Sequence, residues 1–209
     1  MPTLFLNSLL LAATFPQIPP GGTDVVEPGA HLTTAVAGLE RTGAEAKAFA
    51  VTGRPFTKAL RITVRQASPE TNYTQLTLPN VRHVAAGDTM LASFWLRGAA
   101  AGTKRSGRVE FLFERSQNPW TKSITQGAAA GPSWRRVLIP FRSAEAYAPG
   151  EAMASLRVAF GPQNVEIGGV TLTHYGTSQS VDSLRSWALT ADPLGNVRVQ
   201  VNRKDARQT

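Results

Sequence analysis

The stretch from Gly87 to Arg115 constrains the fold of this chain more than any other part of the sequence. Its second half places Val109, Phe111 and Phe113 two residues apart. A period of two residues is typical of β-strands that bury one face. The pattern therefore predicts two strands with one apolar face each, and we expect these two strands to pair. In the first strand the apolar face consists of Met90, Ala92, Phe94 and Leu96.

Other short segments show the same periodicity and are separated by turn signals such as Asn118-Pro119. Their number and spacing are typical of an all-β, antiparallel β-sandwich. We expect further strands over residues 31–40, 47–52, 56–64, 73–78, 121–125, 134–141, 155–160 and 165–175. We also expect a small-residue loop at 127–132, a bulge at Gly168-Gly169, a short helical turn at 183–190 and an isolated strand at 196–201.

Composition limits the classes of function. The chain has 209 residues, of which 42% are hydrophobic and 17% charged, and this is enough for a globular domain with its own core. It contains no cysteine, so disulfides, thiolate metal sites and thiol catalysis are excluded. The net charge of +8 comes from scattered basic residues, which disfavours nucleic acid as a partner and suits an anionic polysaccharide.

The N-terminal residues resemble a secretory signal. The apolar run Leu4–Phe15 is too short to span a bilayer and ends near small residues. We therefore predict a signal peptide and leader at 1–22, cleaved between Thr14 and Gly22, and a secreted or periplasmic protein without a transmembrane segment. The alternative is a β-strand or a disordered start.

The sequence gives little support for an enzyme. The three histidines are far apart and form no metal-binding motif, and no phosphate-binding or nucleophile motif occurs. Glu110 and Glu114 share a face of one predicted strand, but they lie about 13 Å apart along it, which does not favour a hydrolytic pair. Glu110 with Glu166 is the alternative pair. We predict no catalytic residue.

A carbohydrate-binding surface has more support. Trp95 and Arg97 are out of phase with the apolar set of their strand, so we expect them on its opposite face, near Glu110 of the paired strand. An aromatic ring can stack on a sugar, while a forked donor and a carboxylate bind hydroxyl groups. The alternatives are a Trp95 that fills the core and a solvated Arg97–Glu110 ion pair worth less than about 1 kcal/mol. The predicted carbohydrate-binding residues are Tyr73, Gln75, Trp95, Arg97, Glu110, Trp120 and Lys122.

Two segments carry a resemblance to a known family, namely GDTMLASFWLR at 87–97 and VEIGGVTLTHYG at 165–176. With the strands between them, they resemble the carbohydrate-binding modules of the family 4, 9 and 22 group. These modules are galactose-binding-domain-like jelly rolls that are often attached to xylanases and other glycoside hydrolases. The resemblance implies a glycan cleft on a concave sheet, containing Trp95 and Arg97, with Gln75 and Glu110 beside them.

The resemblance also implies a structural calcium ion, although no cofactor is required for binding. Glu40 matches the first part of that site, whereas the expected aspartate falls near Gly168, which offers no ligand.

We interpret the chain as a non-catalytic module that binds a plant cell-wall polysaccharide, such as xylan or another β-glycan, and that targets a linked or associated glycoside hydrolase. The alternatives are a jelly-roll polysaccharide lyase or hydrolase that uses Tyr73, Arg97 and Glu110, and a purely structural sandwich. A histidine near the tyrosine and arginine would favour the enzyme, and a Trp95 buried under a loop would favour the structural role. The predicted parts are a leader at 1–22, a linker and first strand at 23–38, the β-sandwich at 39–176 and a C-terminal extension at 177–209.

Overall fold

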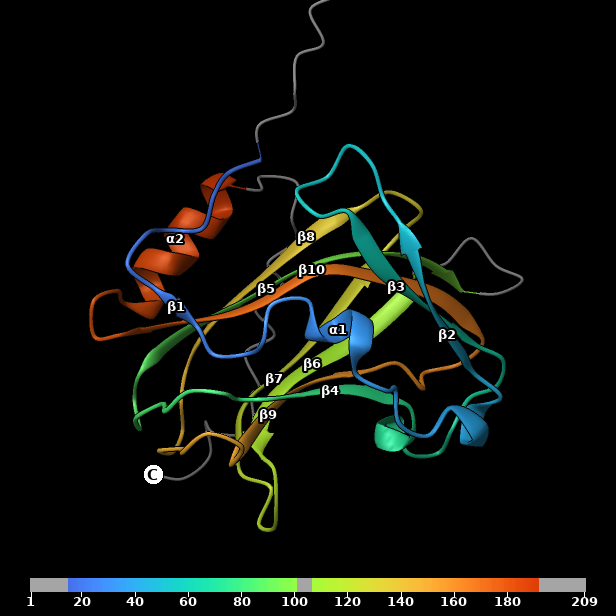
Figure 1. Cartoon of the computed structure of the whole chain (residues 1–209), viewed down its shortest axis with the longest axis horizontal. Coiled ribbons are helices and arrows are strands. Elements are labelled where there is room, and N and C mark those ends of the chain that lie inside the picture. The colour runs from blue at the N-terminus through green and yellow to red at the C-terminus, as the bar shows by residue number, and fades with distance from the viewer. Residues whose placement is uncertain (1–14, 101–106, 192–209) are drawn as a thin grey trace, which may run out of the picture.

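Two antiparallel β-sheets, packed face to face, make up the protein (Figure 1). The computed structural model describes residues 15–100 and 107–191. The predicted signal residues 1–14 and the predicted strand 196–201 lie outside the described residues. The all-β sandwich expected from the sequence is confirmed.

Sheet A has the strand order β2-β3-β10-β5-β8, and the short β1 also pairs with β10. Its strands are β1 (Thr23–Asp24), β2 (Glu45–Ala50), β3 (Lys58–Val64), β5 (Thr89–Ala100), β8 (Arg135–Arg142) and β10 (Gln163–Gly176). Sheet B has the order β4-β9-β6-β7. Its strands are β4 (Gln75–Pro79), β6 (Gly107–Arg115), β7 (Lys122–Ala130) and β9 (Ala152–Arg157).

The core lies between the two sheets and contains the side chains predicted for it. Phe94 of β5 faces Phe111 of β6 with ring centroids 6.1 Å apart, and Phe113 packs edge-on against Tyr147 at 5.5 Å. Such ring pairs add to the stabilisation of about 25 cal/mol for each Å² of apolar surface buried. The predicted core residues found in this one cluster are Leu60, Ile62, Met90, Ala92, Phe94, Leu96, Phe111, Phe113 and Val158.

The two strands of the 87–115 stretch do not pair with each other, so that prediction is wrong. β5 pairs with β10 and β8 in sheet A, whereas β6 pairs with β7 and β9 in sheet B. Their apolar faces oppose each other across the core instead. Where the sheets come together, a Cβ on Gly107 would lie 2.9 Å from the Cα of Gly98. Only glycine at these positions allows the two backbones to approach so closely.

Four helical elements complete the described chain. Three local predictions are corrected: the strand at 31–40 is replaced by two helical turns, the turn at 183–190 lies within a longer helix, and the loop at 127–132 is mostly part of strand β7. Ala128 and Ala130 of β7 pack on the core, which explains why a small-residue run continues as a strand. The helical elements are α1 (Ala30–Thr33), the 3-10 helices η1 (Leu39–Thr42) and η2 (Thr71–Tyr73), and α2 (Val181–Ala191).

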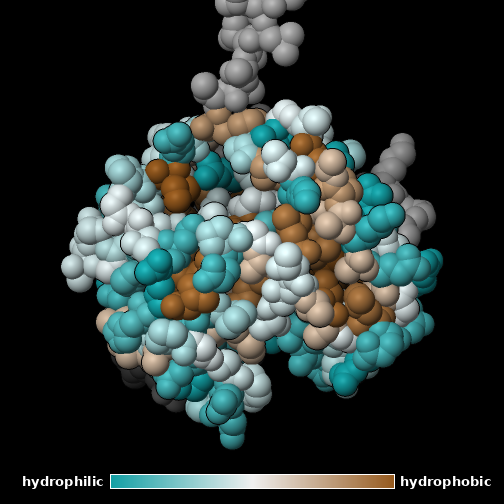
Figure 2. All heavy atoms as spheres, viewed as in Figure 1, coloured by the Kyte–Doolittle hydropathy of each residue, from teal (hydrophilic) through white to brown (hydrophobic). Residues whose placement is uncertain are grey.

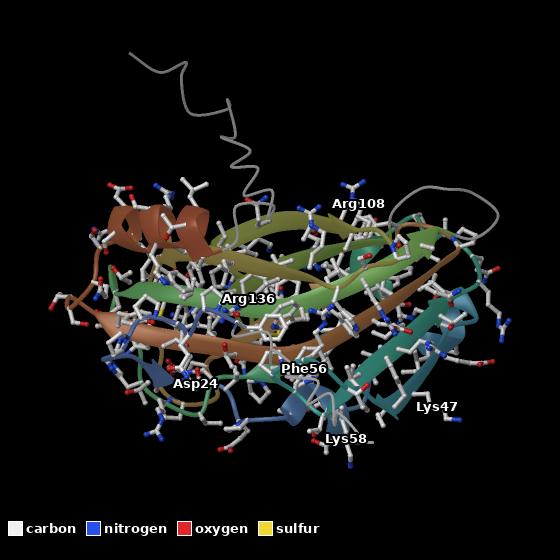
Figure 3. All side chains as sticks on the ribbon, turned by 90° about the horizontal axis from the view of Figure 1, so that it is seen from above. Asp24, Lys47, Phe56, Lys58, Arg108 and Arg136 are labelled. Atoms are coloured by element: carbon white, nitrogen blue, oxygen red, sulfur yellow. The ribbon has the colours of Figure 1, made fainter. Side chains whose placement is uncertain are left out.

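The predicted bulge at Gly168-Gly169 is present and makes room for an aromatic ring. The pairing of β10 with β5 shifts register after Gly168, and Gly169 has φ +57°. A Cβ on Gly168 would lie 2.4 Å from the ring of Phe56. The two glycines therefore let the loop between β2 and β3 place Phe56 on sheet A, where Figure 3 labels it.

A second layer covers part of the outer face of sheet A, which we define as the face turned away from the core. Helix α2 packs on β5 and β8 (Figure 1). Residues 15–19 contribute to the same layer: Ile18 packs beside α2, and the Tyr175 hydroxyl donates to the carbonyl of Pro19 over 2.7 Å. The apolar cluster of this layer consists of Leu91, Leu138, Tyr175, Leu184 and Ala188.

A hydrogen-bonded pair ties the start of β5 to the end of β10. His174 Nε2 lies 2.6 Å from Asp88 Oδ2, and the N–H of Ala85 donates to the same oxygen over 2.7 Å. Burial raises the pKa of Asp88, but the hydrogen bonds from His174 and Ala85 outweigh this effect. The pKa of the carboxyl therefore lies below its usual value, and the pair stabilises this end of the sheet when Asp88 is charged.

Candidate functional site

The predicted binding residues are divided between the outer faces of the two sheets. Trp95 and Arg97 belong to β5 of sheet A, whereas Gln75, Glu110 and Lys122 belong to β4, β6 and β7 of sheet B. The outer faces point away from each other, so no single surface contains all of these residues. The predicted meeting of Arg97 with Glu110 does not occur.

A row of charged residues crosses the outer face of sheet A. The strand register places Lys47 beside Arg61, Arg61 beside Glu166, and Glu166 beside Arg97. Arg61 Nε and one of its terminal nitrogens lie 2.7 and 2.6 Å from one oxygen of Glu166, and Arg97 Nε donates to the other oxygen. The carboxylate that Arg97 binds is thus Glu166 of its own sheet, not the predicted Glu110.

Trp95 lies in the phase predicted for it but is not exposed. It is absent from the main core cluster, yet only 7% of its surface is accessible. Phe15 packs edge-on against its ring at 5.0 Å, and the ring of Phe56 lies 6.2 Å away. Trp95 therefore offers no open ring face for a sugar, contrary to our expectation. It meets the condition that favours a structural role for this part of sheet A.

The outer face of sheet B carries a ladder of polar side chains from all four of its strands. The register places Gln75 beside Arg157, and Arg157 beside Glu110. Further along β6, Glu114 lies beside Lys122. Adjacent strands are about 4.8 Å apart, so the ladder extends over roughly 14 Å from β4 to β7.

Arg157 is at the centre of this polar ladder. Its terminal nitrogens lie 3.5 Å from Glu110 and 3.4 Å from Glu114, and its Nε lies 3.4 Å from the amide oxygen of Gln75. Lys122 Nζ lies 2.8 Å from the other oxygen of Glu114. The contacts of Arg157 are long for charge-assisted hydrogen bonds, and its side chain is 16% exposed.

Exposure separates the groups that can touch a ligand from those that support them. The side chains of Lys122 and Glu110 are 41% and 23% exposed, whereas that of Glu114 is 3% exposed. Ser155, on β9, is fully buried, and its hydroxyl has no hydrogen-bond partner in the described part of the chain. Glu114 is therefore shielded from a ligand, and it holds Lys122 and Arg157 in position through its two carboxylate oxygens.

Trp120 is a large apolar residue that remains exposed, in the turn between β6 and β7. It is 46% exposed and has φ +58°. Its carbonyl accepts a hydrogen bond of 3.1 Å from Lys122 Nζ, which joins the turn to the polar ladder. A left-handed backbone costs a residue with a Cβ about 1–2 kcal/mol. An exposed ring kept at that cost is a candidate for ligand contact.

Tyr73 ends η2, two residues before Gln75, and its ring is occupied by another side chain. The guanidinium of Arg41 stacks over it at 4.6 Å. Its carbonyl also fills the space beside Gly38, where a Cβ would lie 1.5 Å away. Tyr73 therefore joins two loops and is not brought together with Arg97.

Sequence reasoning missed the importance of Arg157 and Glu114. Arg157 alternates with the buried Leu156 and Val158, so its phase indicated an outward side chain. Nothing in the sequence placed it between Gln75 and the acids of β6. That placement requires the knowledge that β9 lies between β4 and β6.

The structure does not bring together the residues that the enzyme alternatives require. Tyr73, Arg97 and Glu110 lie on η2, sheet A and sheet B respectively, so they do not form one site. Glu110 and Glu166 belong to opposite sheets and cannot act as a hydrolytic pair.

Glu40, which the resemblance implies as part of a calcium site, is an exposed residue of the 3-10 helix η1. The Glu40 side chain is 77% exposed and lies 3.7 Å from Arg41. Among the described residues, no group of three or more histidine, cysteine or acidic side chains could hold a metal ion. The calcium site at Glu40 stays a prediction.

On the face seen in Figure 2, hydrophobic residues lie in separate patches between hydrophilic side chains. No helix in the described ranges is long and apolar enough to cross a bilayer.

No protein-family model and no curated protein match the chain. Among solved structures it is similar to the CBM22-1–GH10 modules of Clostridium thermocellum xylanase 10B complexed with xylohexaose, with a TM-score of 0.50, 12% identity, and coverage of 75% of this chain and 28% of that chain. It is also similar to the CBM22-1 xylan-binding domain of Paenibacillus barcinonensis Xyn10C, with a TM-score of 0.46 and 12% identity. That match covers 74% of this chain and 99% of that chain. A structure described as a CBM4 has a TM-score of 0.49 and 15% identity, and the match covers 63% of this chain and 94% of that chain.

These similarities concern the fold. The xylanase structure, whose TM-score reaches 0.50, supports the same conclusion as the strand order of the two sheets. The chain has the β-sandwich fold found in carbohydrate-binding modules, as the resemblance to the family 4, 9 and 22 group implied.

Proposed function

We propose that this protein is a non-catalytic module that binds a polysaccharide along the outer face of sheet B. The observation that carries the proposal is the polar ladder, which crosses all four strands of that sheet. The hydroxyl groups of a glycan both donate and accept hydrogen bonds. The ladder offers guanidinium, ammonium and amide donors beside carboxylate and amide acceptors, and therefore matches both roles.

The charge of the polar ladder favours a neutral glycan. Glu110 and Glu114 are balanced by Arg157 and Lys122, so these four residues together carry no net charge. Xylan or another β-glycan is the class of ligand that we propose. Trp120 would stack on a sugar at the β6–β7 end. One ring and a few hydrogen bonds should give a Kd on the order of 10 µM to 1 mM.

The role that follows is to hold an enzyme near its substrate. A module that is linked to or associated with a glycoside hydrolase raises the effective concentration of the enzyme at the polymer without adding a catalytic group. Secretion or export to the periplasm is part of this proposal, because such polymers lie outside the cell membrane.

Titration calorimetry with soluble xylan and with a soluble β-glucan tests the site. We expect Glu110→Gln and Trp120→Ala each to weaken binding by roughly tenfold, because each removes one direct contact. Glu27→Gln and Leu189→Ala are the matched controls. They make the same kinds of change at an exposed acid and at an exposed apolar residue of α2.

Unchanged affinity in the folded Glu110→Gln and Trp120→Ala proteins would remove sheet B as the site. Absence of binding to any uncharged β-glycan by the intact protein would reject the proposed function.

A further inference from the structure

The outer face of sheet A carries a second group of charged side chains, which is separate from the polar ladder on sheet B. Lys47, Arg61, Glu166 and Arg97 follow one another across neighbouring strands. Arg54 reaches the same area from the β2–β3 loop, and its guanidinium lies 5.3 Å from the centre of the Trp95 ring. This area thus contains four cations and one carboxylate, which contacts Arg61 and Arg97. Within the described ranges, Lys47 and Arg54 have no carboxylate partner.

Glu166 holds two of these cations in fixed positions. Each of its oxygens binds one arginine, and its own side chain is 10% exposed. The side chains of Arg61 and Arg97 are 51% and 33% exposed. A guanidinium has five N–H donors, and Glu166 takes two from Arg61 and one from Arg97. Donors of both arginines therefore remain for a second anion.

Aromatic rings restrict the motion of the same guanidinium groups before any anion binds. A guanidinium stacked on a ring keeps its N–H edge free while its rotation is restricted, so less entropy is lost when an anion binds. The stacked pairs are Arg61 over Phe49 at 4.8 Å, Arg97 over Trp134 at 4.7 Å and Arg54 over Trp95 at 5.3 Å. Figure 3 shows that Lys47 lies toward the β2–β3 side of this surface.

We infer that this surface, made by Lys47, Arg54, Arg61 and Arg97, binds the carboxylate groups of an acidic polysaccharide rich in uronic acid, at a site separate from the polar ladder. The planar fork of a guanidinium matches a carboxylate, and several forks in one area suit a chain that repeats this group. The net charge of +8 acts in the same direction. The choice of a glycan over other polyanions rests on the proposed function.

The test uses the full chain and sodium polygalacturonate, with the fully methyl-esterified polymer as its uncharged counterpart. The double variant Lys47→Gln/Arg54→Gln should bind polygalacturonate at least about tenfold more weakly than the unmodified protein. The control Arg82→Gln/Arg185→Gln removes the same charge at other exposed arginines and should bind as before. Raising NaCl from about 0.05 M to about 0.5 M should also weaken this binding strongly, because the charges are exposed.

The outcomes separate this inference from the proposed function. The double variant should keep its melting temperature and its affinity for uncharged β-glycan, since neither residue belongs to the core or to the polar ladder. Equal binding of the methyl-esterified polymer, or unchanged binding by the double variant, would overturn the inference while leaving the ladder untouched. A DNA duplex that binds as tightly as polygalacturonate would overturn the choice of a glycan.

Discussion

The outer faces of the two sheets differ in what lies on them. On sheet A, helix α2, residues 15–19 and the ring of Phe56 form a second layer, and Trp95 at the centre is buried. On sheet B, the polar ladder leaves Glu110 and Lys122 partly exposed. A side chain that is directed away from the core is therefore not necessarily accessible to a ligand.

The outward residues themselves explain the difference. In sheet A, Leu91, Trp95 and Leu138 are directed away from the core, and burying them in a second layer gains about 25 cal/mol per Å². In sheet B, Leu112 is also directed outward and buried, but its neighbours on the same face include Arg157 and Glu110, which are costly to bury without partners. An apolar outward phase therefore predicts a covered face better than it predicts a binding platform.

Trp95→Ala tests whether the outer face of sheet A is covered. Because Trp95 packs under two aromatic rings, we expect the free energy of unfolding to fall by about 3–5 kcal/mol. Binding of uncharged glycan to the remaining folded protein should not change. Urea unfolding and calorimetry on the same sample measure both quantities. Weakened glycan binding with full stability would restore Trp95 as a binding residue.

Removal of residues 1–22, compared with removal of residues 1–14, tests the second layer itself. The longer deletion removes Phe15 from Trp95, Ile18 from the α2 cluster and the carbonyl of Pro19 from Tyr175. We expect it to cost about 3 kcal/mol more than the shorter one, since two partly buried apolar side chains and one hydrogen bond are lost. Equal thermal unfolding of the two proteins would contradict a covering role for these residues.

Protonation of His31 should make the stability of the whole sandwich depend on pH. Helix α1 contacts β3 of sheet A and β4 of sheet B, and His31 is 3% exposed with no hydrogen-bond partner for either ring nitrogen in the described part. Burial lowers the pKa of His31 to about 4. The unfolded chain takes up the proton first, so stability should fall by about 3 kcal/mol between about pH 6.5 and pH 4 and then level off.

His31→Leu should abolish that slope in urea unfolding measured across this pH range. Asp88→Asn is the control, because the lowered pKa of Asp88 gives stability that is present above its unfolded pKa and is lost at more acidic pH. A slope that survives His31→Leu would assign the acid sensitivity to another group.

The smallest expected effect on stability is at Trp120, the counterpart of Trp95 at the other sheet. Trp120→Ala should change the free energy of unfolding by less than about 0.5 kcal/mol, because the ring is 46% exposed. Trp120→Gly should be about 1 kcal/mol more stable than Trp120→Ala, since glycine relieves the left-handed backbone. Both variants should lose glycan affinity. A large loss of stability in Trp120→Ala would show a packing role instead.

Much of the fold followed from local patterns. Alternation around Phe94 and Phe111 predicted two strands and the correct inward sets, and the glycine pair at 168–169 predicted a bulge. The segments at 31–40 and 127–132 were misassigned because small and β-branched residues suit both strands and loops. For the candidate site, Gln75 and Glu110 were selected from their phase and Lys122 from its place on the next segment, while Arg157 was not selected.

Local alternation was enough to predict which side chains of each strand face the core, because a period of two residues is a property of the strand alone. The three-dimensional arrangement was needed to show that the strands of the 87–115 stretch lie in opposite sheets, that Arg97 pairs with Glu166, and that Arg157 joins Gln75 to Glu110. Strand neighbours are chosen by contacts between residues far apart in the chain, and local periodicity contains no information about them.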